Sequence, residues 1–156
     1  MSTDTDLSTA IALPASWVRR CDPARGVVVA ARPPTVPPSG VSPQITLRVS
    51  EPAETDLDTW RERALGELAA GLPGFDLEDD DRVDAGPYPL AYHRFGHGEG
   101  GDHVLVEQWA WHVSDPVCLG VTLTCAVARG DYVDYCDLFD AVAASIEPSL
   151  LIAPAA

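Results

Sequence analysis

The hydrophobic pattern of the chain is most regular between residues 103 and 128, HVLVEQWAWHVSDPVCLGVTLTCAVA. Two runs rich in β-branched and aromatic residues lie on either side of Ser114-Asp115-Pro116, which is a turn-forming sequence. Runs of this composition, bounded by turn residues, are typical of a β-hairpin. We therefore expect a long hairpin at the centre of an antiparallel sheet, which the other elements extend or cover.

Shorter apolar runs predict further strands around this hairpin. Residues 16–18 and 27–30 flank Asp22-Pro23-Ala24-Arg25-Gly26, a turn sequence that predicts a first hairpin. The proline-rich stretch 32–43 cannot donate a regular series of ladder hydrogen bonds, so we expect a loop or an edge connection there. The remaining predicted strands are residues 44–49, 75–84 and 90–97. The second of these carries an acidic run, which is expected at a solvated sheet edge or in a turn, since charge at an edge discourages unwanted strand pairing.

Two helices are predicted by apolar residues at helical spacing. The apolar face of the first consists of Trp60, Ala64, Leu65, Leu68 and Leu72, and that of the last consists of Tyr135, Leu138, Phe139, Val142 and Ile146. The exposed side of the first helix is expected to carry Arg61, Glu62, Arg63 and Glu67. We expect Thr55 or Asp56 to cap the first helix and Asp131 to cap the last. Gly71 is expected to supply a left-handed position at the end of the first helix.

These elements predict an α+β fold, an antiparallel β-sheet of about six to seven strands flanked by two main helices. A chain of 156 residues is long enough for one domain with a real core and too short for two. We expect this single domain to span residues 11–147. Residues 1–10 are expected to be a disordered tail, and residues 148–156 a loose C-terminal tail.

Charge and composition narrow the classes of function. With 24 acidic and 10 basic residues the formal net charge is -14, which argues against nucleic acid and anionic membranes as partners. All ten basic residues are arginine and the chain has no lysine or asparagine, which indicates a GC-rich bacterial genome. The N-terminus has neither the basic nor the apolar region of a secretory signal, and no stretch approaches the length of a membrane span, so the predicted location is the cytoplasm. Cys21, Cys118, Cys125 and Cys136 show no metal-binding spacing and are expected to be buried free thiols.

The candidate site lies between His93 and His112, where potentially reactive groups gather. If His97 pairs with His103, then His93 lies opposite Glu107. A turn at Ser114-Asp115 would place Trp109 opposite Gly120 and Glu107 opposite Thr122. Because side chains alternate between the two faces of a strand, this register predicts one core face and one aromatic, polar face. The predicted ligand-binding face carries His93, Glu107, Trp109, Trp111, Thr122 and Thr124, with Gly120 leaving room beside Trp109.

Two alternatives accompany this hypothesis. Helices could cover both faces of the sheet, with His93 and Glu107 forming a satisfied cross-strand pair. An enzyme using the same pair as base and orienter would also need a positioned nucleophile, and the sequence has no G-x-S-x-G elbow or recognisable catalytic cysteine. The histidines lack zinc-ligand spacing, and the glycine-rich stretch 98–102 lacks the features of a phosphate loop. We therefore predict no catalytic residues, no metal and no cofactor.

Several short motifs, taken in order, resemble a known family. They are Leu13-Pro14-Ala15-Ser16-Trp17, Leu72-Pro73-Gly74-Phe75, Gly86-Pro87-Tyr88-Pro89 and Gln108 with Thr122-Leu123-Thr124. Together they span residues 11–146 and resemble the actinobacterial LpqN/LpqT lipoprotein family, which has a PsbP-like (Mog-type) fold. The resemblance implies an antiparallel sheet flanked by helices, a binding or accessory role and no established catalytic residues. Proteins of that family carry a signal and a lipid-modified cysteine, whereas Cys21 follows Val18-Arg19-Arg20 without a lipobox, so export and anchoring are not implied.

The sequence thus predicts a non-enzymatic cytoplasmic binding or accessory module whose aromatic, polar sheet face holds a small ligand or a protein segment. A second hypothesis is an acidic adaptor that binds a basic protein partner through its last helix. That helix carries an acidic stripe at three-residue spacing, formed by Asp131, Asp134, Asp137 and Asp140. The sequence leaves the ligand and the oligomeric state open.

Overall fold

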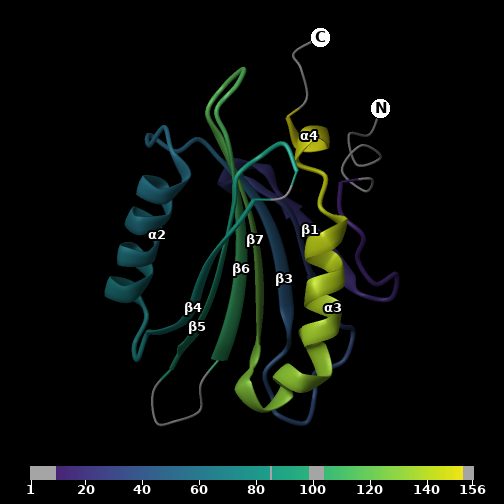
Figure 1. Cartoon of the computed structure of the whole chain (residues 1–156). Coiled ribbons are helices and arrows are strands. Elements are labelled where there is room, and N and C mark those ends of the chain that lie inside the picture. The colour runs from purple at the N-terminus through teal and green to yellow at the C-terminus, as the bar shows by residue number, and fades with distance from the viewer. Residues whose placement is uncertain (1–9, 85, 99–103, 153–156) are drawn as a thin grey trace.

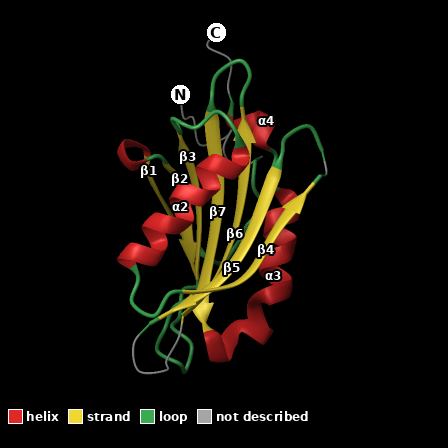
Figure 2. Cartoon of the chain, turned by 60° about the vertical axis from the view of Figure 1, so that its left-hand side comes forward, coloured by secondary structure: helices red, strands yellow, loops and turns green. Residues whose placement is uncertain are grey.

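A computed structural model describes residues 10–84, 86–98 and 104–152. Its centre is a seven-stranded sheet in the order β1-β2-β3-β7-β6-β5-β4, in which every neighbouring pair is antiparallel. The strands are β1 (Val18–Asp22), β2 (Val27–Arg32), β3 (Gln44–Ser50), β4 (Asp76–Val83), β5 (Leu90–His97), β6 (Val104–Val113) and β7 (Leu119–Ala128). The helices are α2 (Leu57–Gly71), α3 (Tyr132–Ser145) and the short α4 (Pro148–Leu151), with single 3-10 turns η1 (Pro23–Arg25) and η2 (Arg129–Asp131). Helix α2 lies on one face of the sheet and α3 on the other (Figures 1 and 2), which confirms the predicted fold class.

The main core lies between the sheet and α3. The apolar face predicted for the last helix is confirmed, because Phe139 and Val142 are fully buried against sheet residues such as Leu47 and Leu123. A smaller apolar cluster under α2 contains Leu57, Trp60, Ala91 and Ala110. The larger cluster therefore carries most of the hydrophobic stabilisation, and α2 is held by fewer apolar contacts.

Both ends of the described chain belong to the fold. The buried Ala10 accepts a hydrogen bond of 3.0 Å from the Glu147 backbone N–H, and the Ala12 N–H donates to the Ser145 hydroxyl at 2.8 Å. The prediction of a disordered tail is therefore wrong at residue 10, and residues 1–9 lie outside the described residues. The predicted loose tail is wrong for residues 148–151, which form α4 and pack Leu151 against the core; residues 153–156 are not described.

The ends of the helices follow the predictions in part. Asp56 caps α2 as predicted, since its Oδ2 accepts a 2.9 Å hydrogen bond from the Thr59 N–H. Gly71 is still helical, and the left-handed residue is Gly74, with φ at 66°, because the helical hydrogen bonding continues to the N–H of Leu72. Asp131 precedes α3 but does not cap it. Its carboxylate instead accepts a 2.6 Å hydrogen bond from the Ser39 hydroxyl, which ties the proline-rich connection to the start of α3.

The register of the central strands differs from the prediction. His97 pairs with Val104, so that His93 lies opposite Gln108, and Trp109 lies opposite Leu123 on β7. The predicted pairing with His103 involves a residue that is not described. Five residues, 114–118, connect β6 to β7, in place of the predicted two-residue turn. The observed pairing differs from the predicted pairing by an odd number of residues on both sides of β6. Compared with the prediction, every side chain of β6 therefore lies on the opposite face of the sheet, while β5 and β7 keep their predicted faces.

Candidate functional site

Because the side chains of β6 lie on the face opposite to the predicted one, the six residues of the predicted ligand face are divided between the two faces of the sheet. Their distribution follows from the strand register: Glu107, Trp109 and Trp111 face α3, whereas His93, Thr122 and Thr124 face α2. Trp109 and Trp111 are only 8% and 7% exposed and belong to the main core, where Trp109 packs on Tyr92 with ring centroids 5.2 Å apart. The predicted aromatic, polar face is therefore not formed, and the predicted His93–Glu107 pair lies on opposite faces of the sheet.

Glu107 is a buried acidic group in the core beneath α3. The Tyr92 hydroxyl donates a short hydrogen bond to its Oε2, and Oε1 has no hydrogen-bond partner among the described residues. Burial raises the pKa of Glu107, because the ionised carboxylate loses hydration that its contacts with Tyr92 and Tyr132 replace only in part.

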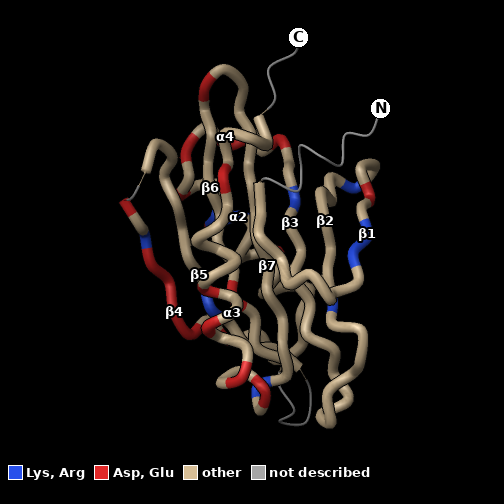
Figure 3. Tube along the Cα trace, turned by 90° about the vertical axis from the view of Figure 1, so that its right-hand side faces the viewer, with Lys and Arg blue, Asp and Glu red and all other residues tan. Residues whose placement is uncertain are grey.

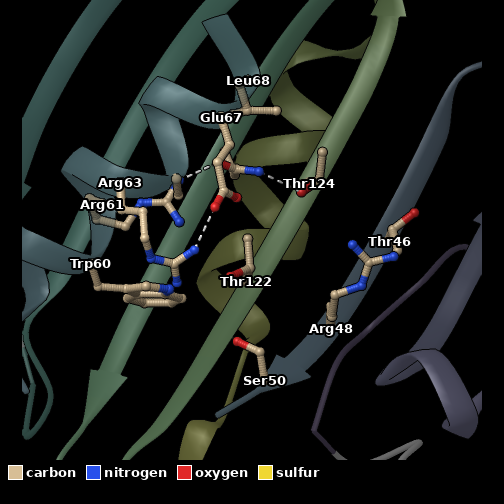
Figure 4. Close-up of a pocket in the computed structure, with 12 residues that line it drawn as sticks. Thr46, Arg48, Ser50, Trp60, Arg61, Arg63, Glu67, Leu68, Thr122 and Thr124 are labelled. Carbon is tan, nitrogen blue, oxygen red and sulfur yellow. Dashed lines mark hydrogen bonds and ion pairs between the residues drawn. The ribbon is translucent and has the colours of Figure 1, made fainter. Parts of the chain in front are cut away.

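The α2 face of the sheet contains a different site, a pocket of about 470 Å³ between the helix and strands β3, β6 and β7 (Figure 4). It has two walls. The helix wall consists of Trp60, Arg61, Arg63, Ala64, Glu67 and Leu68. The sheet wall consists of Thr46, Arg48, Ser50, Gln108, Thr122 and Thr124. Two of the six predicted site residues, Thr122 and Thr124, therefore line a pocket, with neighbours that were not predicted.

The pocket exists because α2 contacts the sheet closely only at its N-terminal end. There the absence of a side chain at Gly120 admits the six-membered part of the Trp60 ring, and Trp60 also packs on His112 at 5.8 Å between centroids. Further along the helix, Ala64 and Leu68 are only partly buried. Facing them, β7 presents the hydroxyl-bearing residues Thr122 and Thr124, so the space between helix and sheet is polar on the sheet side.

Arg61 is the most unusual side chain of this pocket. It is 2% exposed, although the sequence places it on the solvated side of the helix. Its guanidinium donates a short hydrogen bond to Oε1 of Gln108, whose amide in turn donates to the Thr124 hydroxyl at 3.1 Å. The guanidinium carbon also lies 5.1 Å from the centroid of the Trp60 ring, within cation–π range. The prediction for Arg61 was wrong because its hydrogen-bond partner Gln108 comes from a distant part of the chain.

No carboxylate among the described residues forms an ion pair with Arg61, and its Nε has no hydrogen-bond partner there. Burial and, second, the nearby charge of Arg82 lower the pKa of Arg61 to about 10, although the negative charge of Asp80 acts in the opposite direction. At neutral pH the group is still a cation. A buried cation without a carboxylate partner is costly, because the hydration that it loses is not replaced by an opposite charge.

The pocket is basic within an acidic molecule. Its lining contains three arginines and one glutamate, which is a net charge of +2, whereas the whole chain has a net charge of -14. Arg63 is neutralised by Glu54 at 2.6 Å and Glu67 at 2.7 Å. Arg48 is exposed and forms no ion pair with any residue that the structure describes. Arg48 and Arg61 are thus the two cations that remain available to a ligand.

His93 lies beside the pocket, beneath α2, with no exposed surface. Its Nε2 is 3.0 Å from Oδ1 of Asp80, but neither ring nitrogen has a partner with hydrogen-bond geometry in the described chain. Burial and, second, the positive charge of Arg61 lower the pKa of His93 to about 4, while Asp80 acts in the opposite direction. His93 is consequently neutral at physiological pH.

The described residues contain no group of three or more acidic, histidine or cysteine side chains that could hold a metal ion. The four cysteines are free, but the prediction that all are buried is wrong: Cys21 is exposed, and only Cys125 is fully buried. Cys118 lies 3.5 Å from Nε2 of His112, yet its thiol points at the carbonyl oxygens of Pro52 and Glu54. A thiol that donates to carbonyl groups is not arranged as a thiolate nucleophile, so this pair fixes the segment before α2.

Comparisons with known proteins support the fold. No family model matches the sequence, and no curated protein matches it. Several solved structures are similar, and three of them illustrate the range. LpqN, involved in cell envelope biogenesis of Mycobacterium tuberculosis, has a TM-score of 0.66 at 17% identity over 85% of this chain and 78% of its own. A putative regulator of unknown function from Pseudomonas aeruginosa has a TM-score of 0.61 at 11% identity, covering 92% and 90%. Cyanobacterial PsbP from Synechocystis has a TM-score of 0.61 at 17% identity, covering 86% and 83%.

These likenesses confirm the predicted LpqN-like and PsbP-like fold, and at such low identity they establish the fold alone. In the part of the chain that the structure describes, no helix is both long and apolar enough to cross a membrane.

Proposed function

We propose that this protein is a non-enzymatic binding module that holds an anionic group of its ligand in the pocket between α2 and the sheet. The observation that carries this proposal is the buried Arg61, which forms no ion pair with any carboxylate of the described residues. A carboxylate or phosphate group beside it would supply the missing opposite charge. Charge-assisted hydrogen bonds of this kind contribute about 1.5–3 kcal/mol each.

The rest of the pocket suits a ligand with one anionic end. Arg48 offers a second cation from β3, and the hydroxyls of Ser50, Thr122 and Thr124 can accept or donate hydrogen bonds. Trp60 provides an apolar wall. A volume of about 470 Å³ lies in the range of small-molecule sites. An accessory role also agrees with the descriptions of two structural neighbours, one involved in cell envelope biogenesis and one a putative regulator. The cytoplasmic location stays a prediction from sequence.

Replacement of Arg61 by methionine tests the proposal. We expect Arg61→Met to weaken binding of small carboxylates and phosphate by about 10- to 100-fold, the loss of one charge-assisted interaction. The variant itself should be as stable as the unmodified protein or more stable, because it removes a buried unpaired charge. Thermal unfolding with citrate, glutarate and inorganic phosphate, at ionic strength matched with chloride, measures both effects.

The matched control is Arg129→Met, since Arg129 is an exposed arginine that pairs with Glu78 at β4, away from the pocket. This variant should keep the full response to the anions. The proposal is wrong if Arg61→Met responds to the anions like the unmodified protein, or if the control loses the response equally.

The acidic adaptor stays a second proposal, supported by the exposure of Asp134, Asp137 and Asp140 on α3. The fourth residue of the stripe, Asp131, is engaged by Ser39. Replacing the three exposed aspartates by asparagine should abolish binding of a lysine-rich test peptide and its dependence on salt concentration. Retention of that binding by the triple variant, measured by fluorescence anisotropy, would argue against the adaptor.

A further inference from the structure

The sheet face that forms one wall of the pocket continues beyond it across β2 and β1. The register establishes which side chains share this face. Ala31 pairs with the core residue Ile45, so the neighbouring Ala30 and Arg32 point to the opposite side, the side of the pocket residue Thr46. On β1, Val18 pairs with Arg32 and Arg20 pairs with Ala30. Because directly paired residues share a face, Arg20, Arg32 and Arg48 all lie on the pocket side of the sheet.

These three arginines differ from most of the others because they have no side-chain partner among the described residues. All three are exposed, and within the described ranges none of them forms an ion pair or a side-chain hydrogen bond. The arginines that do pair with carboxylates are Arg25, Arg63, Arg82, Arg94 and Arg129. Arg19, on the core side of β1, donates to the carbonyl oxygens of Leu13 and Pro14. The unpaired cations of this acidic chain are thus gathered on one face.

Charge is segregated across the whole sheet. Figure 3 shows arginines along β1 at one edge and an almost continuous acidic stretch along β4 at the other. Near the arginine face, the acidic residues are few: Asp22 lies close to Arg25 at the end of β1, Glu67 is held by Arg63, and Glu51 follows β3. The face is therefore locally basic although the net charge of the chain is -14.

The spacing of the arginines is larger than a small anion. Arg20 and Thr46 are aligned two strands apart, through Ala30, and Arg48 is two residues beyond Thr46. Strands about 4.8 Å apart and a rise of about 3.3 Å per residue place the Cα atoms of Arg20 and Arg48 roughly 12 Å apart. The pocket extends this row further toward Arg61. A ligand that contacts the whole row is an extended chain with several acidic groups.

We propose that the arginine face, defined as Arg20, Arg32 and Arg48 together with the pocket, docks an extended acidic segment of a partner protein. The inference rests on the proposed function, since Arg61 would receive one of the acidic side chains of that segment. A polypeptide fits better than a nucleic acid, because its carboxylates are separated by apolar or neutral residues and the face carries Val18, which is 47% exposed, beside Ala30.

A fluorescein-labelled peptide of alternating glutamate and valine, eight residues long, tests this by fluorescence anisotropy. The matched glutamine–valine peptide controls for the charge. We expect Arg20→Gln/Arg32→Gln to weaken binding of the acidic peptide by about 2- to 30-fold, because each of the two exposed charges contributes about 0.2–1 kcal/mol. The same double variant should keep the thermal response to citrate, since the pocket is unchanged. Arg20→Lys/Arg32→Lys should retain most of the affinity, and raising the salt concentration should weaken it.

Each other outcome overturns the inference in a distinct way. If the unmodified protein responds to citrate but does not bind the acidic peptide, the docking surface is wrong and the pocket function stands. If it responds to neither, both proposals fall. Tighter binding of a single-stranded oligonucleotide than of the peptide would assign the face to nucleic acid. A salt-sensitive dimer that Arg20→Gln/Arg32→Gln dissociates would assign it to a second copy of this chain.

Discussion

Gly120→Ala is expected to lower the free energy of unfolding by about 1–3 kcal/mol, the usual cost of overpacking a tightly filled site. A Cβ atom at position 120 would lie 2.5 Å from two carbon atoms of the Trp60 ring and 3.1 Å from the Ser50 hydroxyl. The ring cannot move away freely, because it is nearly buried and packs on both His112 and the Arg61 guanidinium. The substitution should therefore push the N-terminal end of α2 away from the sheet.

Urea unfolding measures this cost, and the chain offers a matched control. Gly66 lies within α2, and a Cβ atom there would meet nothing within 4 Å. Gly66→Ala should stabilise the protein by up to about 1 kcal/mol through helix propensity alone. Changes of opposite sign in the free energy of unfolding for Gly120→Ala and Gly66→Ala would distinguish steric overlap from the general effect of replacing glycine.

A double-mutant cycle tests whether Trp60 is the residue with which the new Cβ atom overlaps. Trp60→Phe removes the part of the ring that a Cβ atom at Gly120 would meet, so the cost of Gly120→Ala should fall in that background. An undiminished cost in the Trp60→Phe background would mean that Trp60 is not responsible. Loss of the citrate response in Gly120→Ala would further link the seating of α2 to the pocket.

The elements of this fold were predictable because their signals are local. The apolar spacing on the last helix, the turn at Asp22–Gly26 and the alternation in residues 44–49 each lie within a short stretch, and the structure confirms them. The apolar face predicted for the first helix is confirmed only in part, because Trp60 is buried whereas the other four residues are partly buried. The acidic stretch 75–84 is also an edge strand, as predicted.

The orientation of β6 was not predictable from its own sequence. All of its residues except Val104 are buried, so the strand shows no alternation between apolar and polar positions that would indicate its core side. The register then depends on the two connections, and an error of one residue in either exchanges the faces. Gly120 illustrates the result: it does make room for a tryptophan ring, but the ring is Trp60 from the helix and not Trp109 from the neighbouring strand.

The pocket could not be predicted because it depends on where α2 lies relative to the sheet. A charged residue next to Trp60 on a helix is normally solvated, and nothing near Arg61 in sequence indicates otherwise. Its hydrogen-bond partner Gln108 lies 47 residues away on β6, and Gln108 in turn donates to Thr124 on β7. A signal was available in the clustering of hydroxyl residues on β7, since Thr122 and Thr124 were correctly placed on one face with His93.

Acidification from pH 6.5 to 4 is expected to cost the protein about 3 kcal/mol through His93 alone. Burial and the neighbouring Arg61 lower the pKa of His93 in the folded state from 6.5 to about 4. A histidine with a lowered pKa is preferentially neutral when folded, so its full contribution to stability is present above the unfolded pKa of 6.5. As the pH falls, the unfolded chain takes up the proton first, and the contribution is lost until the pH reaches the folded pKa near 4.

His93→Gln should remove this loss, because glutamine is similar in polarity and does not titrate. Urea unfolding at several pH values between 4 and 7.5 gives the free energies of unfolding of the unmodified protein and His93→Gln. The stability of the unmodified protein relative to the variant should fall as the pH is lowered below 6.5. Glu107 acts in the opposite direction, since its raised pKa makes it more stabilising as the pH falls. The comparison should therefore be repeated in a Glu107→Gln background. The two residues face opposite sides of the sheet, so the effect of His93 should be the same in both backgrounds. A parallel pH dependence of the unmodified protein and His93→Gln would show that His93 is not held neutral by burial beneath α2.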